Sequence, residues 1–478
     1  MVDLLRGLLD VSVGSDEALT GQLTSQLRRL IADGRLRPGQ SLPSSRTLAQ
    51  SLDVSRNTVS YAIEQLAAEG YLRTSQGRRP VVAAGLSFES GAPTTHRTRH
   101  ARLPRVSPWA RDLHRVDWPP VYIGRPRALQ PGLADEREFP HALWARCLRR
   151  AASNALRRQD QSPNHPALQS ALLRHLAEQR GIKADPDQIV VVPTAQAGLA
   201  LIAKVLLGAG DIAWVESPGY GGATVALQAA GANVVGVPVD EAGLKITGRR
   251  DMPRLIFVTP SHQYPTGHLM PVGRRLELLR LAERVGAAIV EDDYDGEFHY
   301  EARPIAALQG LTSFRNIFYL GTFSKSMFAD IRVGYIVVPQ SLIDTVKLAQ
   351  RHMGLLTSIT LQAALADFIA SGAYLAHVRR MARLYRARRD RLVQALAAEA
   401  RGRLTVDVPA GGMQLLARCG SIDDRALSAR LDAAGVVTRP VSTMTLHQPR
   451  TRGLFLGFAA WTEAEIDRAA RTIGRHVR

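Results

Sequence analysis

The segment GTFSKSMFADIRVGY, residues 321–335, begins where an apolar run, 317–320, ends. Such a run is typical of a short buried strand, so the polar residues after it are expected at a strand end. Lys325 lies in this segment and is one of only five lysines in the 478-residue chain. It alone among the five stands in a polar cluster after a predicted strand, which makes it the first candidate for chemistry that needs an amine. Arg332, seven residues later, is suited to hold an anionic group.

Apolar runs and helical patterns alternate along the chain before this segment. The strand candidates are 189–192, 212–215, 234–239, 255–258, 287–290 and 317–320. Helical patterns such as 272–285 separate most of them, which predicts a largely parallel α/β sheet. An arginine-rich helical stretch, 374–398, and short strands near 413–418 and 454–458 predict a smaller α+β C-terminal subdomain from about residue 365.

Five of the predicted strands are each followed by a cluster of polar residues. The clusters occupy residues 194–196, 217–220, 261–267, 291–294 and 322–325. Because ligands of parallel α/β sheets bind at the carboxyl ends of the strands, the clusters predict one shared pocket.

The residue types in these clusters match the requirements of pyridoxal 5'-phosphate. This cofactor needs a lysine for its Schiff base, a carboxylate beside the ring nitrogen, and cations or hydroxyls around the phosphate. We predict Lys325, Asp292 and Arg332 for these three roles, with Tyr294 at the ring oxygen and Tyr220 stacked on the ring. The other candidates for cofactor binding are Thr194, Ala195, Gln196, His262, Thr322 and Ser324.

Each of these residues, taken alone, has a simpler explanation. Asp292 and Asp293 would also suit a magnesium site, Tyr220 a core position, and His262 a structural hydrogen bond. Their ordered occurrence between residues 194 and 332 favours the cofactor pocket, and we predict no metal site.

Two segments carry a resemblance to a known family. GTFSKSMFADIRVGY is similar to the Schiff-base motif of fold-type I aminotransferases, and IVEDDYDGEFHY (289–300) to the segment that supplies their ring-nitrogen Asp and ring-oxygen Tyr. The resemblance covers about residues 135–478. It implies an aminotransferase-like α/β body with a mostly parallel sheet and supports the roles given above to the lysine, aspartate, tyrosine and arginine.

Residues 19–82 have the pattern of three short helices followed by a hairpin. Leucines at helical spacing form the first helix, a second follows Pro43, and Ser55 is a good N-cap for the third. Arg56, Asn57 and Ser60 are predicted on the side of the third helix that enters the major groove. The unit is also basic, with nine arginines against four acids in residues 20–80. A helical protein-interaction module is the alternative.

The stretch LPSSRTLAQSLDVSRNTVSYAIEQLAAEGYL (42–72) resembles the GntR-type winged helix-turn-helix. The positions that contact DNA in that family match Arg46, Ser55, Arg56, Asn57, Thr58 and Gly77, to which we add Ser60 and Arg78. Because this head is joined to an aminotransferase-like body, the chain resembles the MocR subfamily of regulators. Within that subfamily it is similar to the pyridoxal phosphate-responsive, PdxR-like members. The resemblance implies a double-stranded DNA operator as partner and a head-to-tail homodimer.

Composition and charge agree with this organisation. We predict a DNA-binding domain over 1–82, a linker rich in arginine and proline over 83–135, and the body over 136–478. The net charge of +18 and a pI near 10.6 favour a polyanionic partner. Two cysteines, Cys147 and Cys419, exclude a disulfide framework, and no signal peptide or membrane span is evident, so we expect a cytoplasmic protein.

The sequence also departs from the aminotransferase pattern. Phe455 stands where an arginine usually clamps the substrate carboxylate, and Gly222 where amino-acid-sensing relatives have a second arginine. Tyr264 replaces an asparagine, residues 329–330 replace a Pro-Gly pair, and 159–162 lack the tyrosine that reaches a partner's phosphate site.

These departures favour a sensor with at most weak transaminase activity over a working enzyme. We predict a pyridoxal phosphate-dependent transcriptional regulator that senses the cofactor itself and controls vitamin B6 metabolism. The alternatives are an amino-acid sensor, in which Arg439, Arg452 or a linker arginine replaces the clamp, and a working aminotransferase with a DNA-binding head. A DNA-binding scaffold with an empty body is disfavoured by the intact cofactor residues.

Overall fold

A computed structural model describes residues 2–12, 17–84, 106–113, 124–155, 162–246, 252–300, 306–311, 316–446 and 451–477. Most of the predicted linker (85–105 and 114–123) and residues 159–161 lie outside these described residues. The chain forms two compact units, Met1–Arg105 and Val106–Arg478, which we call the head and the body and describe separately.

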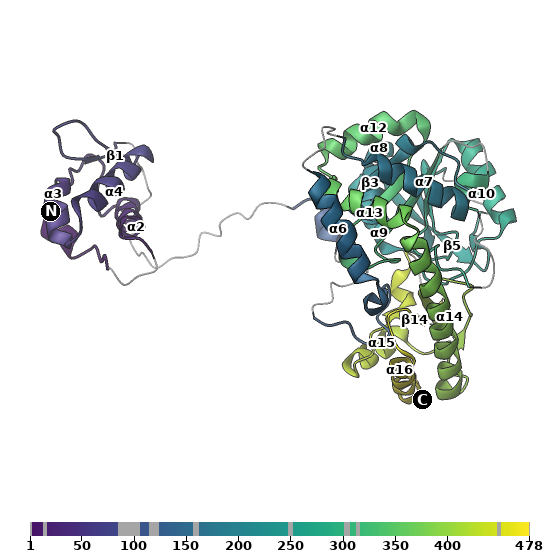
Figure 1. Ribbon diagram of the computed structural model, residues 1–478. Coiled ribbons are helices and arrows are strands. Elements are labelled where there is room, and N and C mark those ends of the chain that lie inside the picture. Colours follow the sequence, from purple (N-terminus) through teal and green to yellow (C-terminus); the bar gives the residue numbers. More distant parts are fainter. Residues whose placement is uncertain are drawn as a thin grey trace. The chain divides into compact units, whose positions relative to one another are not determined.

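The head is a winged helix-turn-helix, as predicted (Figure 1). Helices α2 (Leu19–Ala32), α3 (Ser45–Leu52) and α4 (Arg56–Ala68) precede an antiparallel hairpin of β1 (Leu72–Arg73) and β2 (Val81–Val82). The hydroxyls of Ser44 and Ser55 cap α3 and α4 by accepting from the backbone N–H of Thr47 and Thr58. The turn between the two helices passes through Asp53, which has a left-handed backbone with φ 53°.

The apolar faces of these helices form one core. Its fully buried members include Leu23, Leu27, Leu48, Val59 and Leu66. A short helix that the sequence did not reveal, α1 (Val2–Arg6), carries Leu5 into the same core. Burial of this shared face stabilises helices that are too short to persist alone.

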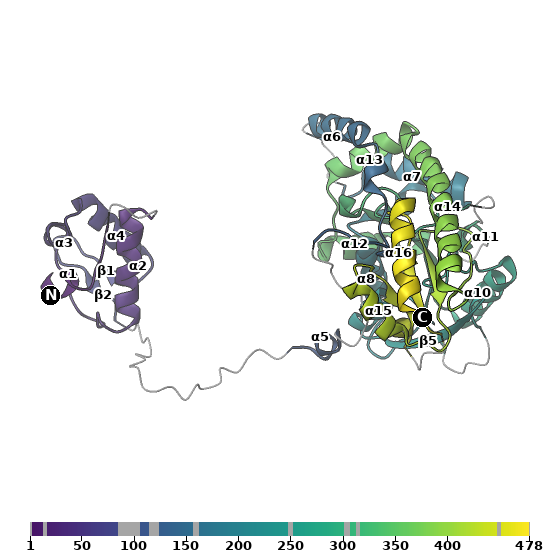
Figure 2. The ribbon, with the colours of Figure 1, turned by 90° about the horizontal axis from the view of Figure 1, so that it is seen from below.

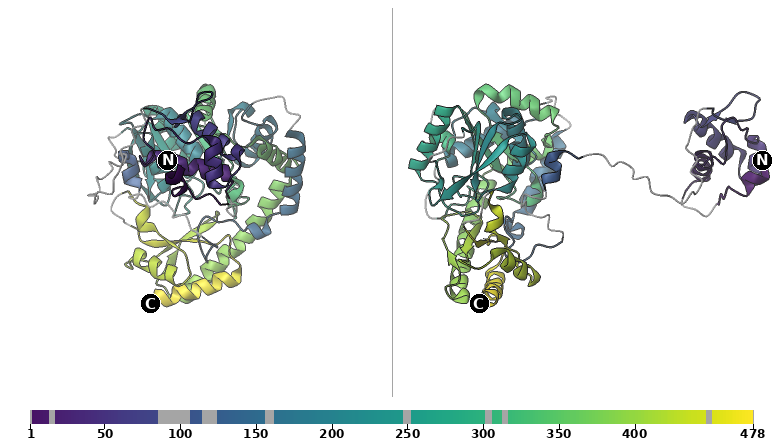
Figure 3. Two further views of the ribbon diagram at one scale, coloured as in Figure 1. Left: turned by 90° about the vertical axis from the view of Figure 1, so that its left-hand side faces the viewer. Right: turned by 180° about the vertical axis from the view of Figure 1, so that it is seen from behind.

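The body contains an eight-stranded sheet in the order β3-β10-β9-β8-β7-β4-β5-β6 (Figure 3). The strands are β3 (Ile189–Val192), β4 (Ile212–Ser217), β5 (Asn233–Asp240), β6 (Gly243–Leu244), β7 (Leu255–Val258), β8 (Ala288–Asp292), β9 (Ile317–Thr322) and β10 (Gly334–Val337). In the order of the sheet, the strands β9, β8, β7, β4 and β5 are each parallel to their neighbours within this group. The exceptions are β6, antiparallel to β5, and β10, antiparallel to both β9 and β3.

Helices cover both faces of this sheet, which explains why its strands read as unbroken apolar runs. In β3, Val190 and Val192 pack with residues of the helices on one face, whereas Ile189 and Val191 pack with those on the other. The first face carries α8 (Ala195–Leu206), α9 (Gly221–Ala229) and α12 (Ile343–His352). The second carries α7 (Pro166–Arg180), α10 (Val272–Val285), α11 (Leu308–Leu311) and α13 (Ile359–Ala370).

The C-terminal part is a smaller α+β subdomain. It has a four-stranded antiparallel sheet in the order β11-β12-β14-β13. Its strands are β11 (Thr405–Val406), β12 (Gln414–Arg418), β13 (Arg439–Pro440) and β14 (Gly453–Gly457). The helices are α14 (Ala373–Ala400), α15 (Asp424–Ala433) and α16 (Glu463–His476), and Figure 2 shows α16 alongside α14. Helix α6 (His141–Ala155) packs on α13.

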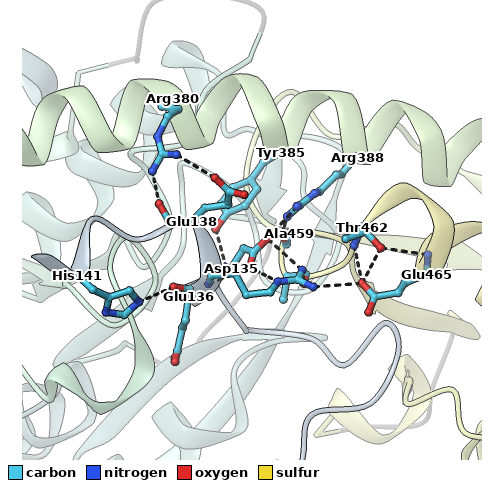
Figure 4. A network of polar contacts seen from close by, with 12 residues as sticks. Asp135, Glu136, Glu138, His141, Arg380, Tyr385, Arg388, Ala459, Thr462 and Glu465 are labelled. Carbon is cyan, nitrogen blue, oxygen red and sulfur yellow. Dashed lines mark hydrogen bonds and ion pairs between the residues drawn. The ribbon is translucent and has the colours of Figure 1, made fainter.

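A buried ionic network ties the segment that precedes α6 to this subdomain (Figure 4). The carboxylate of Asp135 lies 2.7 Å from Arg137 Nε and 2.8 Å from Nη2 of Arg388 on α14. Burial alone would raise the pKa of Asp135, but the hydrogen bonds from Arg137 and Arg388 hold this pKa below its usual value. Arg388 also donates to the carbonyl of Ala459. The network holds Asp135 against the C-terminal subdomain, and the backbone N–H of Gly457 donates to the Leu129 carbonyl, so the chain is bound to this subdomain on both sides of residues 131–132.

Within the described residues, no single helix is long and apolar enough to cross a membrane. One bent pair, α13 with α14, passes that test by length and composition only.

Candidate functional site

A cavity of about 500 Å³ opens at the carboxyl ends of the sheet strands. All five predicted polar clusters contribute to its wall, so the structure brings them together. Of the eleven predicted cofactor residues, ten line the cavity: Thr194, Ala195, Gln196, Tyr220, Asp292, Tyr294, Thr322, Ser324, Lys325 and Arg332. The further lining residues are Pro131, Gly132, Thr259, Tyr264, Gln414 and Arg439.

His262 is the predicted residue that does not line the cavity. Its side chain is buried, with Nδ1 2.8 Å from Asp295 Oδ1, and its ring packs against His299. The backbone carbonyl of His262 accepts a hydrogen bond of 3.1 Å from the Tyr294 hydroxyl. His262 therefore contacts a cavity residue, Tyr294, only through its backbone carbonyl. Its imidazole makes the structural hydrogen bond that the sequence analysis gave as the alternative to cofactor binding.

Lys325 follows β9, is half-buried and lines the cavity. Its Nζ donates to the carbonyl of Gly132 at 2.6 Å. Burial lowers the pKa of Lys325, while Asp295 and Asp292 oppose this shift. A neutral amine is the nucleophilic form, so the environment favours covalent chemistry at this nitrogen. Gly132 has φ +83°, and a Cβ there would lie 3.0 Å from Nζ, so a larger residue would crowd the amine.

Asp292 ends β8, is buried and also lines the cavity. Its Oδ1 is buried and has no hydrogen-bond partner within the described residues. Burial, together with the negative charges of Asp293, Asp295 and Glu216, raises the pKa of Asp292 to about 8. An unpaired buried acceptor is costly, and a cationic N–H donor placed in the cavity would satisfy it. A protonated ring nitrogen would be such a donor.

Asp293, the next residue, serves a different purpose. Its Oδ2 lies 2.8 Å from Arg180 Nε and accepts from the Tyr319 hydroxyl at 2.5 Å. Burial would raise the pKa of Asp293, but Arg180 lowers it. Because neighbouring strand residues point to opposite sides, the two carboxylates do not converge on one point as a magnesium site would require. Among the described residues, no group of three or more His, Cys, Asp or Glu side chains is placed to hold a metal.

We expect Asp292→Asn to change how the stability of the cofactor-free protein depends on pH. The carboxyl has a pKa near 3.8 when unfolded and about 8 when folded, so the folded chain retains a proton between these values. Stability from this proton is complete below pH 4 and is lost as the pH rises towards 8, by up to about 1.4 kcal/mol per pH unit. The variant, which cannot ionise, should therefore become more stable than wild type by a margin that grows with pH.

Tryptophan fluorescence during heating measures this margin in the body alone, because all five tryptophans lie in residues 106–478. A difference in apparent Tm that stays constant from pH 5 to pH 8 would show that Asp292 does not titrate as the structure indicates.

The other end of the cavity offers donors to an anion. Thr194 caps α8 by accepting from Ala197 N at 3.0 Å, so the backbone N–H groups of Ala195 and Gln196 begin the helix at the cavity wall. Ser324 and the exposed guanidinium of Arg332 line the same cavity. Helix N-termini, hydroxyls and arginine together form a suitable phosphate site.

Aromatic rings form the remaining wall. Tyr220 immediately precedes α9, and its ring lies parallel to that of Phe257. The ring of Tyr264 meets Tyr220, Tyr294 and Phe455 edge-on, with centroid distances of 5.6, 5.8 and 5.0 Å. The Tyr264 hydroxyl accepts a 2.7 Å hydrogen bond from Nη1 of Arg439, which also lines the cavity. Of the arginines named as replacements for the missing clamp, the structure brings Arg439 into the cavity, whereas Arg452 donates to the Ser421 carbonyl outside it.

The head carries the residues that the sequence predicts to contact DNA. Arg46, Arg56, Asn57, Gly77 and Arg78 are exposed, and Gly77 adopts φ +75° in the loop between β1 and β2. The hydroxyls of Ser55 and Thr58 lie 2.8 Å apart and are engaged in the cap of α4, and Ser60 is half-buried. The sequence did not single out Tyr61, whose side chain is 64% exposed on the same helix.

Comparisons with known proteins match both units. Residues 19–82 match the model of bacterial regulatory proteins of the gntR family, and residues 133–473 that of aminotransferase class I and II. The chain is 39% identical to the probable rhizopine catabolism regulatory protein MocR of Rhizobium meliloti, covering 93% of this chain and 91% of that one. The chain belongs to the MocR-type family of transcriptional regulators. It is thus a DNA-binding regulator with an aminotransferase-like body, as predicted.

Other relatives and a solved structure extend this result. The pyridoxine biosynthesis transcriptional regulator PdxR of Corynebacterium glutamicum is 35% identical over 77% of each chain. The regulator TauR of Rhodobacter capsulatus is 34% identical over 88% of this chain and 89% of its own. The kynurenine aminotransferase of Pyrococcus horikoshii, 24% identical, superimposes with a TM-score of 0.69 over 80% of this chain and 96% of its own, which confirms the fold of the body.

Sequence reasoning missed several residues of the cavity. Pro131 and Gly132 fell in the predicted linker, and no local signal marks them, because their place depends on the ionic network around Asp135. Gln414 comes from β12 of the C-terminal subdomain. Thr259 directly follows β7, so counting polar residues from the end of that strand would have included it.

Proposed function

We propose that this regulator binds pyridoxal 5'-phosphate in the cavity of the body and that the occupancy of the cavity controls DNA binding by the head. The observation that carries the proposal is that Lys325 and Asp292, whose buried Oδ1 has no hydrogen-bond partner among the described residues, line the same cavity. Pyridoxal phosphate supplies an aldehyde with which a lysine amine condenses, releasing one water.

The other residues of the cavity have matching tasks in this proposal. Asp292 accepts the N–H of the pyridine ring. The Tyr294 hydroxyl, which has one proton, donates to the ring oxygen in place of the His262 carbonyl, its present acceptor. Tyr220 stacks on the ring. The N-terminus of α8, with Ser324 and Arg332, holds the phosphate. These assignments keep the roles predicted from sequence, except that the His262 side chain does not line the cavity.

A path from the cavity to the linker supports control of DNA binding. Helix α5 (Pro108–Asp112), labelled in Figure 2, lies in the linker region. The indole Nε1 of Trp109 on this helix donates to the carbonyl of Val225 in α9 at 3.2 Å. Helix α9 starts directly after Tyr220, which lines the cavity. A ligand that moves Tyr220 therefore acts on the helix that anchors α5.

We propose that the protein works in the cytoplasm as a head-to-tail homodimer.

Two signals are compatible with this scheme. The first is pyridoxal phosphate itself, which would make the protein a regulator of vitamin B6 supply, and one relative is named for pyridoxine biosynthesis. The second is an amino compound read by the loaded cavity, which the position of Arg439 favours.

The test measures DNA affinity with and without cofactor. Duplexes selected from a random pool by the full-length chain serve as operators, and fluorescence anisotropy gives their Kd for cofactor-free and cofactor-loaded protein. We expect the Kd to change at least about tenfold on loading, a coupling of about 1.4 kcal/mol. Pyridoxine 5'-phosphate, which lacks the aldehyde, is the matched control and should have a much smaller effect. Equal affinities in the loaded and unloaded states would refute control by the cavity.

A further inference from the structure

We propose that Arg439 is the residue that recognises a carboxylate on the effector of this regulator, taking the place of the clamp that Phe455 cannot provide. The inference rests on the proposed cofactor site and specifies the class of ligand that the loaded cavity reads. Three observations on the described residues carry it: the strand register, the burial of the guanidinium, and its present partner.

The register explains how Arg439 reaches the cavity. In the C-terminal sheet, Arg439 on β13 is directly opposite Phe455 on β14. Cross-strand partners project from the same face of a sheet, so the two side chains lie next to each other. Tyr264 contacts both, by an edge-on ring contact with Phe455 and a hydrogen bond from Arg439. Arg439 thus lies in the cavity wall one strand away from Phe455, the position at which the sequence pattern leads one to expect a carboxylate-binding arginine.

The guanidinium is held where solvent does not compete for it. Arg439 is only 6% exposed, and its positive charge lowers the pKa of the nearby Tyr220, although burial raises that pKa overall. Because the side chain is buried and lines the cavity, a carboxylate that enters the cavity would meet a cation that solvent screens little.

The hydrogen bond to Tyr264 marks a place that a ligand can take. Its acceptor is a neutral phenol oxygen, and a carboxylate makes a stronger, charge-assisted and often bidentate bond with arginine. Exchange of the Tyr264 hydroxyl for a carboxylate oxygen would therefore be favourable. The rings of Tyr220 and Tyr264, both in the cavity wall, would then enclose the apolar part of the ligand. The class of ligand that fits is a small amino acid.

The experiment titrates the cofactor-loaded full-length chain by isothermal calorimetry with the twenty protein amino acids and β-alanine. Each ligand that binds is compared with the amine that lacks its carboxyl group. We expect at least one amino acid to bind and its matched amine to bind at least tenfold more weakly. Arg439→Gln should lower the affinity for that amino acid at least tenfold. The visible absorbance of the bound cofactor should be unchanged in this variant.

Two further variants separate recognition from folding. Arg452→Gln, which changes an arginine outside the cavity, should bind like wild type. Tyr264→Phe removes the competing hydroxyl and should bind the amino acid as tightly as wild type or more tightly. Equal binding by Arg439→Gln and wild type, or no binding of any amino acid to wild type, would overturn the inference and leave the cofactor itself as the signal. Absence of cofactor absorbance in wild type would instead refute the proposed function, on which the inference depends.

Discussion

Replacing Lys325 by alanine is expected to abolish the visible absorbance band of the Schiff base that the protein forms with pyridoxal phosphate and to remove the effect of the cofactor on DNA affinity. Lys325 lines the same cavity as Asp292, whose buried Oδ1 has no hydrogen-bond partner among the described residues. Noncovalent binding through Arg332, Asp292 and the α8 N-terminus should persist at higher concentration, so the loss concerns the covalent bond.

Lys204→Ala is the matched control, because Lys204 is exposed on α8 and does not line the cavity. This variant should retain both the absorbance and the response to cofactor. A Lys325→Ala protein that still forms a borohydride-reducible bond would place the cofactor on another lysine.

The second large effect is expected at the DNA surface. Arg56 is the first residue of α4, where side chains of a recognition helix come closest to base edges, and it is exposed. Arg56→Ala should cost about 1–3 kcal/mol of binding free energy and relax the sequence preference. Arg46 is exposed in the first turn of α3 and is expected to contact the phosphate backbone of the DNA. Arg46→Ala should therefore weaken binding to all duplexes alike.

Competition between a selected operator and a scrambled duplex distinguishes the two roles. The slope of log K against log salt should fall by about one for Arg46→Ala, because one phosphate contact is lost. If Arg56→Ala lost equal affinity for both duplexes, a base-reading role would be excluded.

Features that depend on local chemistry could be predicted from the sequence. The caps at Ser44 and Ser55 delimit the helices of the head, and the apolar runs that end in polar clusters locate β3, β4, β7, β8 and β9. The positions of these clusters then predicted the cavity, because parallel strands place their carboxyl ends along one edge.

Features that depend on long-range packing could not be predicted. Strand β10 is a four-residue run that begins at the end of the Lys325 segment, and only its antiparallel pairing with β9 and β3 places it inside the sheet. Gly132 reaches Lys325 through a segment fixed by Asp135 and Arg388, residues far apart in the chain. The choice of Arg439 over Arg452 depends on the register between β13 and β14, for which the sequence has no signal.

The central claim is that the cavity holds pyridoxal phosphate on Lys325, and reduction with borohydride tests it most directly. The full-length wild-type chain is loaded with the cofactor, reduced, digested with trypsin and analysed by mass spectrometry. A modified Lys325 resists trypsin, so we expect a phosphopyridoxyl group on a peptide that spans residues 316–332, in place of the separate peptides 316–325 and 326–332. No modification, or modification confined to the lysines at 183, 204, 245 and 347, would contradict the account.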